Sequence, residues 1–276
     1  MPENASPVVT IAVPSFNQGR FLERALESIF EQNIPVEVFV MDGGSRDNSL
    51  QVIKKWEHKL SWWRSHADAG QAAAINEAIA LGKAPFVCWL NSDDWLEPNG
   101  LQKLVDALEV APSAPVAYGK AWDVSDATGM RTPVWTEPFS TKRLALRCIV
   151  SQPASLIRRK AWESVGGADP NLHMAMDYDL WWRLFGRFGS FVYVEEFIAV
   201  NRSHQETKTS QFRRQHYREA IAVVRKYNHS VPLKWWIAQP YAVWYKSAIN
   251  LFKETRLFDA KNNNSSRAQN AKFGQD

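Results

Sequence analysis

The sequence has few cysteines and no long apolar run, and each absence excludes a class of protein. Its 276 residues include only Cys88 and Cys148, which show no CxxC spacing. We therefore expect two reduced thiols rather than a disulfide framework. No apolar run reaches the roughly 18 residues that a membrane-spanning helix needs. The opening residues, MPENASPVV, lack the basic and apolar segments of a secretory signal peptide. These features predict a cytoplasmic protein.

Common phosphate-binding motifs are missing as well. The turn after the first apolar segment reads VPSFNQGRFLERAL, with one glycine and no GxGxxG, which argues against a dinucleotide site of the usual type. The GxxxxGK[ST] loop of nucleotide hydrolases is absent. A nucleotidyltransferase would need a triphosphate loop rich in glycine and basic residues there, and PSFNQGR offers one of each. This reading is therefore disfavoured.

Charge is unevenly distributed, although the net charge is only +4. Residues 1–200 carry 19 lysines and arginines against 24 acids, whereas residues 201–276 carry 14 against 5. The excess of basic over acidic residues thus lies in the C-terminal part of the chain, apart from its main body. In nucleic-acid-binding proteins the basic face coincides with the recognition fold, so we expect no nucleic-acid partner. A basic tail is more typical of contact with an anionic surface.

The first 110 residues alternate between strand and helix patterns. Strands are expected at 7–14, 36–41, 62–66 and 85–90, and helices at 21–30, 50–56, 72–82 and 100–108. This order predicts an α/β fold, with a Rossmann-like, mostly parallel sheet flanked by helices. Further along, we expect helices at 140–147 and 177–189, a polar loop at 201–211, a basic helix, and an aromatic basic helical stretch to about residue 258.

Polar clusters follow each of the four expected strands. They are Ser15–Asn17, Asp42–Ser45, Asp68–Gly70 and Asn91–Asp94. Ligands of open α/β sheets bind at the carboxyl ends of the strands, so we expect these clusters to share one site. The adjacent carboxylates Asp93 and Asp94 suit Mg²⁺ or Mn²⁺, which would offset their repulsion. The alternative for Asp94 is the N-cap of the following helix.

Two later segments carry further candidates. In HMAMDYDLWWRL, we expect Asp179 to cap the helix and Asp177 to project into the site as a general base. His204 lies in the polar loop. It is either an exposed loop histidine or a late metal ligand.

Taken in order, several segments resemble family 2 glycosyltransferases of the GT-A fold, of the polysaccharide and O-antigen biosynthesis type. They are VTIAVPSFNQGRFLERALESIFEQ, VMDGGSRDNS, DAGQAAAINEAIA, WLNSDDWLEP, VGGADPNLHMAMDYDLWWRL and NRSHQETKT, within residues 8–210. The resemblance implies a nucleotide-sugar donor (a UDP, GDP or dTDP sugar), a divalent metal, and inversion at the anomeric carbon. It assigns 1–110 to donor binding and 111–210 to the acceptor. Residues 211–260 would then form a helical extension and 261–276 a disordered tail.

The resemblance also suggests site residues. The nucleotide would be bound by Pro14, Phe16, Asn17, Asp42, Asp68 and Gly70. The Asp-x-Asp metal motif falls on Asn91-Ser92-Asp93, so Asp93 keeps the metal position while Asn91 replaces the first acid and is expected to bind a ribose hydroxyl. The family's Glu-Asp pair falls on Met176-Asp177 and again keeps one acid, the base. Gly166 and Gly167 match the acceptor-side loop, and His204 matches a late histidine beside the metal or diphosphate.

The sequence leaves two alternatives open, one about the C-terminal stretch and one about catalysis. The stretch from 232 to 258 predicts either a helix that packs on the main domain or an interfacial helix on an anionic membrane, which would suit a glycan or lipid-linked acceptor. Because Asn91 and Met176 replace acids, a non-catalytic protein that binds nucleotide sugars is the alternative to an enzyme.

Overall fold

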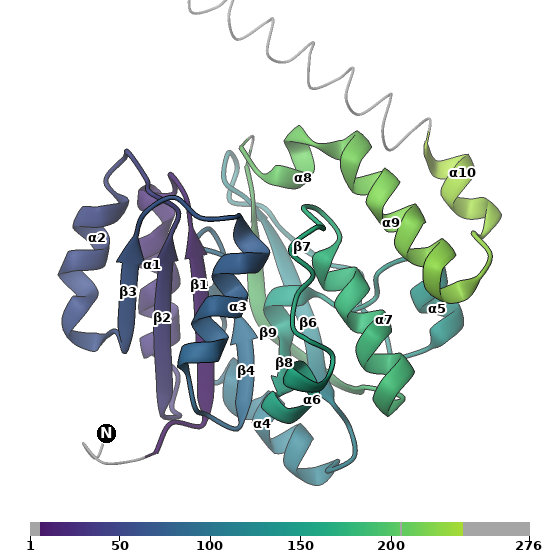
Figure 1. Ribbon diagram of the computed structural model, residues 1–276, viewed down its shortest axis with the longest axis horizontal. Helices are drawn as coiled ribbons and strands as arrows, with labels where there is room; N and C mark the ends of the chain where they lie inside the picture. Colours follow the sequence, from purple (N-terminus) through teal and green to yellow (C-terminus); the bar gives the residue numbers. More distant parts are fainter. Residues whose placement is uncertain (1–5, 205, 240–276) are drawn as a thin grey trace, which may run out of the picture.

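A sheet with two different halves organises the molecule (Figure 1). The computed structural model describes residues 6–204 and 206–239, and nine strands in these ranges form one sheet of order β3-β2-β1-β4-β8-β6-β9-β5, with β7 paired to β6. The first half is parallel and consists of β1 (Val9–Ser15), β2 (Val36–Asp42), β3 (Trp62–Ser65) and β4 (Phe86–Trp89). All residues of β1 and β4 are buried, as expected for strands covered on both faces.

The second half of the sheet is mixed. It consists of β5 (Trp95–Leu96), β6 (Val116–Ser125), β7 (Arg131–Pro133), β8 (Ser155–Arg158) and β9 (Val192–Ser203). Strand β8 runs antiparallel to both β4 and β6, whereas β9 runs parallel to β6 and antiparallel to the short β5. The α/β class and the parallel first half of the sheet agree with the sequence prediction, and the second half adds antiparallel pairs to it.

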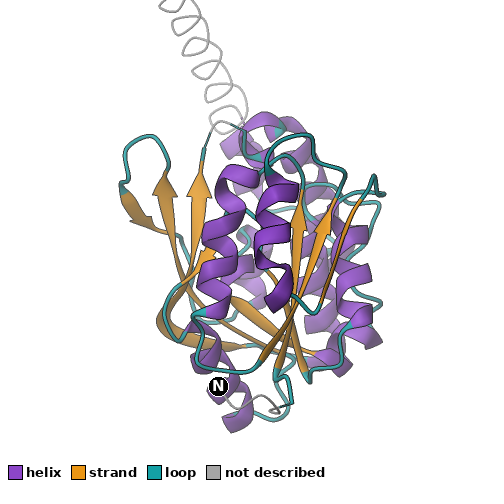
Figure 2. Ribbon diagram, turned by 90° about the vertical axis from the view of Figure 1, so that its left-hand side faces the viewer, coloured by secondary structure: helices purple, strands orange, loops and turns teal. Residues whose placement is uncertain are grey.

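Helices cover both faces of the sheet (Figure 2). Along the first half they are α1 (Gly19–Phe30), α2 (Ser49–Trp56), α3 (Gln71–Leu81) and α4 (Gly100–Val110), with one 3₁₀ turn, η1 (Glu57–Lys59). One core packs α1, α2 and α4 against Ile11, Val13 and Val40. The other packs α3 against Ala12 and Met41 on the opposite face. Alternation along each strand therefore supplies two apolar layers.

The second core continues under the helices of the other half. These are α5 (Thr141–Leu146), α6 (Arg159–Ser164) and α7 (Met176–Phe188), with the 3₁₀ turn η2 (Gln152–Ala154) before β8. Fully buried Trp181 of α7 stacks on Trp89 of β4, with ring centroids 6.3 Å apart. The ring of Trp162 in α6 packs edge-on against the same Trp89, with ring centroids 6.0 Å apart. Several of the tryptophans therefore belong to this core.

The C-terminal elements pack back on the body. They are α8 (Lys208–Gln211), α9 (Arg213–Asn228) and α10 (Leu233–Gln239). The polar loop expected at 201–211 is only partly a loop, because β9 continues through Ser203 and α8 begins at Lys208. Val224 of α9 and the ring of Trp235 join the α7 core. The remainder of the predicted extension and the tail, residues 240–276, lie outside the described residues. No described helix is long and apolar enough to cross a bilayer.

Candidate active site

Three segments that are distant in sequence meet at Asp93, just after β4. The Asp93 Oδ2 atom accepts a hydrogen bond from Gln18 Nε2 at 3.1 Å and lies 3.0 Å from His204 Nε2. Gln18 immediately precedes α1, and His204 immediately follows β9. The Asp93 side chain is 13% exposed and the His204 side chain 3%. A carboxylate and an imidazole thus form a sheltered pair at the end of the sheet.

The exposed-loop interpretation of His204 is wrong. Its ring packs against Phe21, with centroids 4.7 Å apart, and its Nδ1 atom is buried without a hydrogen-bond partner in the described structure. Packing and the Asp93 contact therefore set the orientation of the imidazole. Among the described residues, no group of three histidine, cysteine or acidic side chains could hold a metal. A metal bound here would need further oxygen ligands from a substrate or water.

Asp94 does not cap a helix, contrary to the alternative considered from the sequence. Its Oδ1 atom accepts from Arg202 N at 3.0 Å, and its Oδ2 atom accepts from Asn91 Nδ2 at 3.0 Å. Helix α4 begins only at Gly100. Burial, followed by the charge of Asp93, raises the pKa of Asp94 well above its usual value. Asp94 is thus a buried link between β4 and β9, and Asp93 is the acid that faces the site.

Two glutamines that the sequence interpretation missed connect the polar clusters. Gln18 joins Asp93 to Ser92, whose hydroxyl donates to Gln18 Oε1. Gln71, the first residue of α3, donates from Nε2 to Asn91 Oδ1 at 2.7 Å. Gln18 directly follows the cluster Ser15–Asn17, and Gln71 directly follows Asp68–Gly70. This position next to a polar cluster is the sequence feature that could have predicted their role.

The nucleotide-side candidates lie along the ends of β1 and β2. Pro14 is buried within β1, and Phe16, 61% exposed, follows the strand. Asn17 adopts a left-handed φ of 52°, and its side chain accepts from Arg46 N at 2.9 Å. A Cβ added to Gly43 would lie 3.2 Å from Phe16 Cδ2 and 3.7 Å from Asp68 Oδ2. Phe16 and Asp68 therefore flank the same backbone.

Asp42 is fully buried and shapes this loop. Its carboxylate accepts from Gly44 N at 3.1 Å, Ser45 N at 2.9 Å and Ser65 Oγ at 2.7 Å, and also from the Ser45 hydroxyl. Donors of its own chain thus occupy the oxygens that were expected to hold a base. Contact of this carboxylate with a base would require one of these bonds to be exchanged.

Asp68 and Gly70 lead into α3. The Asp68 carboxylate accepts from Gly70 N at 2.8 Å and from Arg64 Nη2 at 3.2 Å. Gly70 has a φ of 104° and stands at the N-cap position, where no side chain caps the helix. Few residues other than glycine adopt this φ. Because glycine has no side chain, the first N–H groups of α3 receive no side-chain cap from this position.

At the start of α7, Asp177 and Asp179 have different environments. Asp177 is half-buried and its Oδ1 atom accepts from Tyr178 N at 2.8 Å. Burial raises its pKa, an effect opposed by the Tyr178 hydrogen bond and the nearby His216. Asp179 is fully buried and pairs with Arg183 Nε at 2.6 Å and Tyr227 Oη at 2.8 Å. The predicted capping role of Asp179 is wrong, because Ala175 occupies the N-cap position of α7.

Arg183, also missed from the sequence, connects Asp179 to the glycine loop. Its Nη1 atom donates to the carbonyl of Gly167 at 2.7 Å. Gly166 and Gly167 have φ values of 77° and 70°. A Cβ on Gly167 would approach Asn76 Oδ1 to 2.5 Å. Glycine is therefore required here by both conformation and space, and the loop is held against α3.

Comparison with known proteins identifies the chain. The family model described as "Glycosyl transferase family 2" matches residues 10–166. The chain belongs to this family. Chondroitin synthase from Escherichia coli is 24% identical over 207 residues, which cover 74% of this chain and 30% of that relative. The chain thus spans less than a third of that relative's length.

Solved structures share the GT-A fold. S. aureus TarS 1–349 in complex with UDP superposes with a TM-score of 0.62 at 18% identity, covering 82% of this chain and 66% of that one. The mannosyltransferase PcManGT from Pyrobaculum calidifontis, in complex with GDP-Man and Mn²⁺, gives 0.63 at 18% identity, covering 98% and 82%. The predicted family and fold are confirmed.

Proposed function

We propose that this chain is an inverting glycosyltransferase that moves a sugar from a nucleoside-diphosphate sugar to an acceptor hydroxyl, in cell-surface polysaccharide or lipid-linked oligosaccharide synthesis. The observation that carries the proposal is the sheltered Asp93–His204 pair, 3.0 Å apart, at the edge where β1, β2 and β4 end. Residues 1–110 would bind the donor and 111–210 the acceptor. UDP in TarS and GDP-Man in PcManGT support a nucleoside-diphosphate donor.

The residues present fit a divalent metal. Asp93 and His204 offer one carboxylate and one imidazole, a donor set that Mn²⁺ or Mg²⁺ accepts when phosphate oxygens complete the shell. Mn²⁺ in the PcManGT structure supports this choice. When bound, such an ion neutralises the charge of the departing diphosphate. Gln18 would orient Asp93 through their 3.1 Å hydrogen bond.

Asp177 would act as the general base. The acceptor oxygen forms a bond to the anomeric carbon while the bond from that carbon to the diphosphate oxygen breaks, and its electron pair leaves with the diphosphate. The acceptor proton passes to Asp177. Attack from the opposite face inverts the anomeric centre. The raised pKa of Asp177 strengthens it as a base, provided that it is ionised at the working pH.

Thermal stabilisation by nucleotides tests the donor site. UDP, GDP, dTDP and CDP would each be added with and without Mn²⁺, because a ligand that binds only the folded state raises the melting temperature. We expect one nucleotide to stabilise the protein in a Mn²⁺-dependent way, and Asp93→Ala to lose that dependence. Asp106→Ala, an exposed acid on α4, is the matched control. No shift with any nucleotide would reject the proposal.

The acceptor side has an exposed apolar surface on α10. Leu233 and Ile237 are 69% and 68% exposed and Trp236 44%, although the neighbouring Trp235 packs inward and donates to Ala145 O at 2.8 Å. We infer that this surface rests on the anionic cytoplasmic face of a membrane, near a lipid-linked acceptor. The intact protein should bind vesicles with phosphatidylglycerol at low salt, and Trp236→Glu should weaken binding. No binding by the unmodified protein would rule this out.

A further inference from the structure

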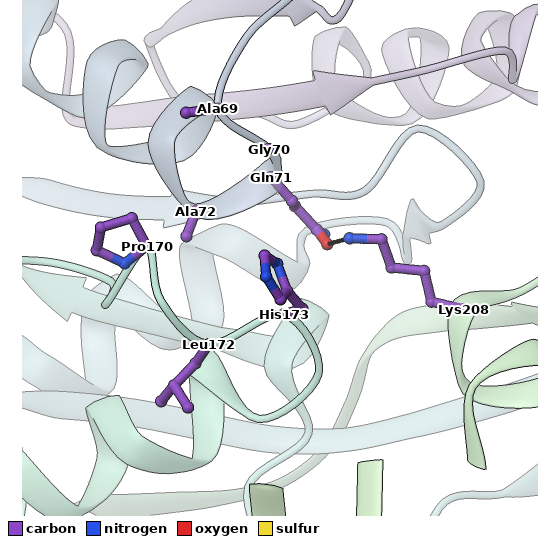
Figure 3. Close-up of a pocket in the computed structure, with 8 residues that line it drawn as sticks. All are labelled: Ala69, Gly70, Gln71, Ala72, Pro170, Leu172, His173 and Lys208. Atoms are coloured by element: carbon purple, nitrogen blue, oxygen red, sulfur yellow. Dashed lines mark hydrogen bonds between the residues drawn. The ribbon is translucent and has the colours of Figure 1, made fainter. Parts of the chain in front are cut away.

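Lys208 lies at a small pocket between α3 and the loop that precedes α7 (Figure 3). Gly70, Gln71 and His173 contribute to the lining together with Lys208. Lys208 is the first residue of α8, and its ammonium group donates to Gln71 Oε1 at 2.8 Å. Lys208 is exposed, but its side chain reaches Gln71 at the edge of the pocket.

The ammonium group of Lys208 forms its hydrogen bond with a neutral partner among the described residues. Its hydrogen-bond partner is a neutral amide, and Lys208 forms no ion pair in the described parts of the chain. By contrast, Lys226 pairs with Asp179 at 3.3 Å. Glu219, then Asp68 and Asp93, attract Lys208 electrostatically, but none of these three described acids lies within ion-pair distance of it. An oriented cation bonded to a neutral amide is suited to an anionic ligand.

Gln71 links this cation to the Asp93 cluster. Its Nε2 atom donates to Asn91 Oδ1 at 2.7 Å while its Oε1 atom accepts from Lys208. Gln71 is also the first residue of α3, an 11-residue helix without a side-chain cap. Uncapped N–H groups and the helix dipole favour an anion at this end. Gln71 thus connects a cation and an uncapped helix N-terminus to Asn91, two residues before Asp93.

We propose that Lys208, held by Gln71, binds the diphosphate of the donor and gives this chain a diphosphate affinity that does not depend on a metal. The inference rests on the proposed function. Asn91 is neutral where the Asp-x-Asp pattern has an acid, so the site repels the diphosphate less than two acids would. The electron pair that stays with the diphosphate after sugar transfer would then also be stabilised by Lys208.

Nucleotide affinity measured by calorimetry tests this role without an activity assay. The full chain and its variants would be titrated with the nucleoside diphosphate that stabilises the protein, and with the matching monophosphate, each with and without Mn²⁺. Lys208→Gln should weaken metal-free diphosphate binding about tenfold, the size of one charge-assisted hydrogen bond. The monophosphate should lose less. Lys208→Arg should retain most of the affinity.

Lys83→Gln is the matched control, because Lys83 is exposed just beyond the other end of α3 and its change alters net charge equally. Melting temperatures of all variants without ligand check folding. Unchanged diphosphate affinity in Lys208→Gln, or an equal loss with Lys83→Gln, overturns the inference while the proposed function stands. Failure of the unmodified protein to bind any nucleoside diphosphate, with or without Mn²⁺, rejects the proposed function itself.

Discussion

The candidate residues and their neighbours include two acidic pairs, and the members of each pair differ in the same way. After β4, Asp94 is buried and hydrogen-bonded to Arg202 N, whereas the neighbouring Asp93 faces His204. At the start of α7, Asp179 is buried against Arg183, whereas Asp177 is only half-buried. In each pair one acid is bonded within the scaffold, and the other is the acid to which we assign contact with a ligand.

This difference shows how two buried acids can fix the segments that carry the candidate site residues. Asp94 fixes the end of β9, which carries His204, and Asp179 orients Arg183, which holds the Gly167 carbonyl at 2.7 Å. Asp94 and Asp179 therefore act on the candidate site by holding backbone groups in place, Asp94 directly and Asp179 through Arg183. Substituting the two kinds of acid should affect stability and transfer separately.

Asp177→Asn should have the largest effect. Loss of a general base lowers the transfer rate by about 10²- to 10⁴-fold. The amide keeps the size of the side chain, so nucleotide-induced thermal stabilisation should stay unchanged. Release of the nucleoside diphosphate in the presence of acceptor measures transfer, with Asp106→Asn as the control. Full activity in Asp177→Asn would remove Asp177 from the mechanism.

The pH dependence of transfer sharpens the same assignment. Burial raises the pKa of Asp177, and only the ionised carboxylate accepts a proton. The rate should therefore fall as pH decreases through a value above the ordinary aspartate pKa of about 3.9. An acidic limb at or below that value would contradict a base whose pKa is raised by its surroundings.

Asp179→Ala should mainly reduce stability. It removes a carboxylate that is 1% exposed and leaves Arg183, 20% exposed, without its partner. Breaking a buried pair of this kind costs about 3 kcal/mol of unfolding free energy. Urea denaturation measures the loss. Asp169→Ala, which changes a half-buried acid in a loop, is the control. A loss below about 1 kcal/mol would show that Asp179 is not a scaffold residue.

Asn91→Asp should strengthen metal binding. An added charge about 4 Å from a cation contributes roughly 1 kcal/mol even at the dielectric constant of water, or about fivefold in affinity. The Mn²⁺ concentration that gives half of the maximal nucleotide stabilisation should fall accordingly, and exposed Asn33→Asp should leave it unchanged. Unaltered Mn²⁺ dependence in Asn91→Asp would place the metal away from this position.

Periodicity predicted the first half of the fold well. The helices and the four parallel strands up to residue 110 follow apolar repeats, and the structure places them close to the expected limits. The second half resisted prediction because its strands are short or irregular. Strand β5 has two residues, and β9 pairs with β6 across register shifts. Such pairs depend on distant partners rather than on a local pattern.

The site was predictable only in part. The contact between Asp93 and His204 joins residues 111 positions apart, and family resemblance rather than spacing suggested it. Both capping interpretations failed because burial decides the role of Asp94 and Asp179, and burial is a tertiary property. Gln71 and Arg183 were missed for a related reason: a polar residue on a predicted helix is normally solvated.

Asp94→Asn should have the smallest effect, which depends on pH. The folded-state pKa of Asp94 is raised, so its stabilising contribution is complete below the unfolded-state pKa and is lost as pH rises through the folded-state value. The neutral amide avoids that loss. Relative to the unmodified protein, Asp94→Asn should therefore gain unfolding free energy as pH rises from acid to neutral, as measured by urea denaturation across this range. Asn33→Asp, which adds an acid at an exposed position, serves as the comparison. Parallel pH profiles for Asp94→Asn and the unmodified protein would mean that Asp94 is ionised without cost, and the distinction between the two acids after β4 would fail.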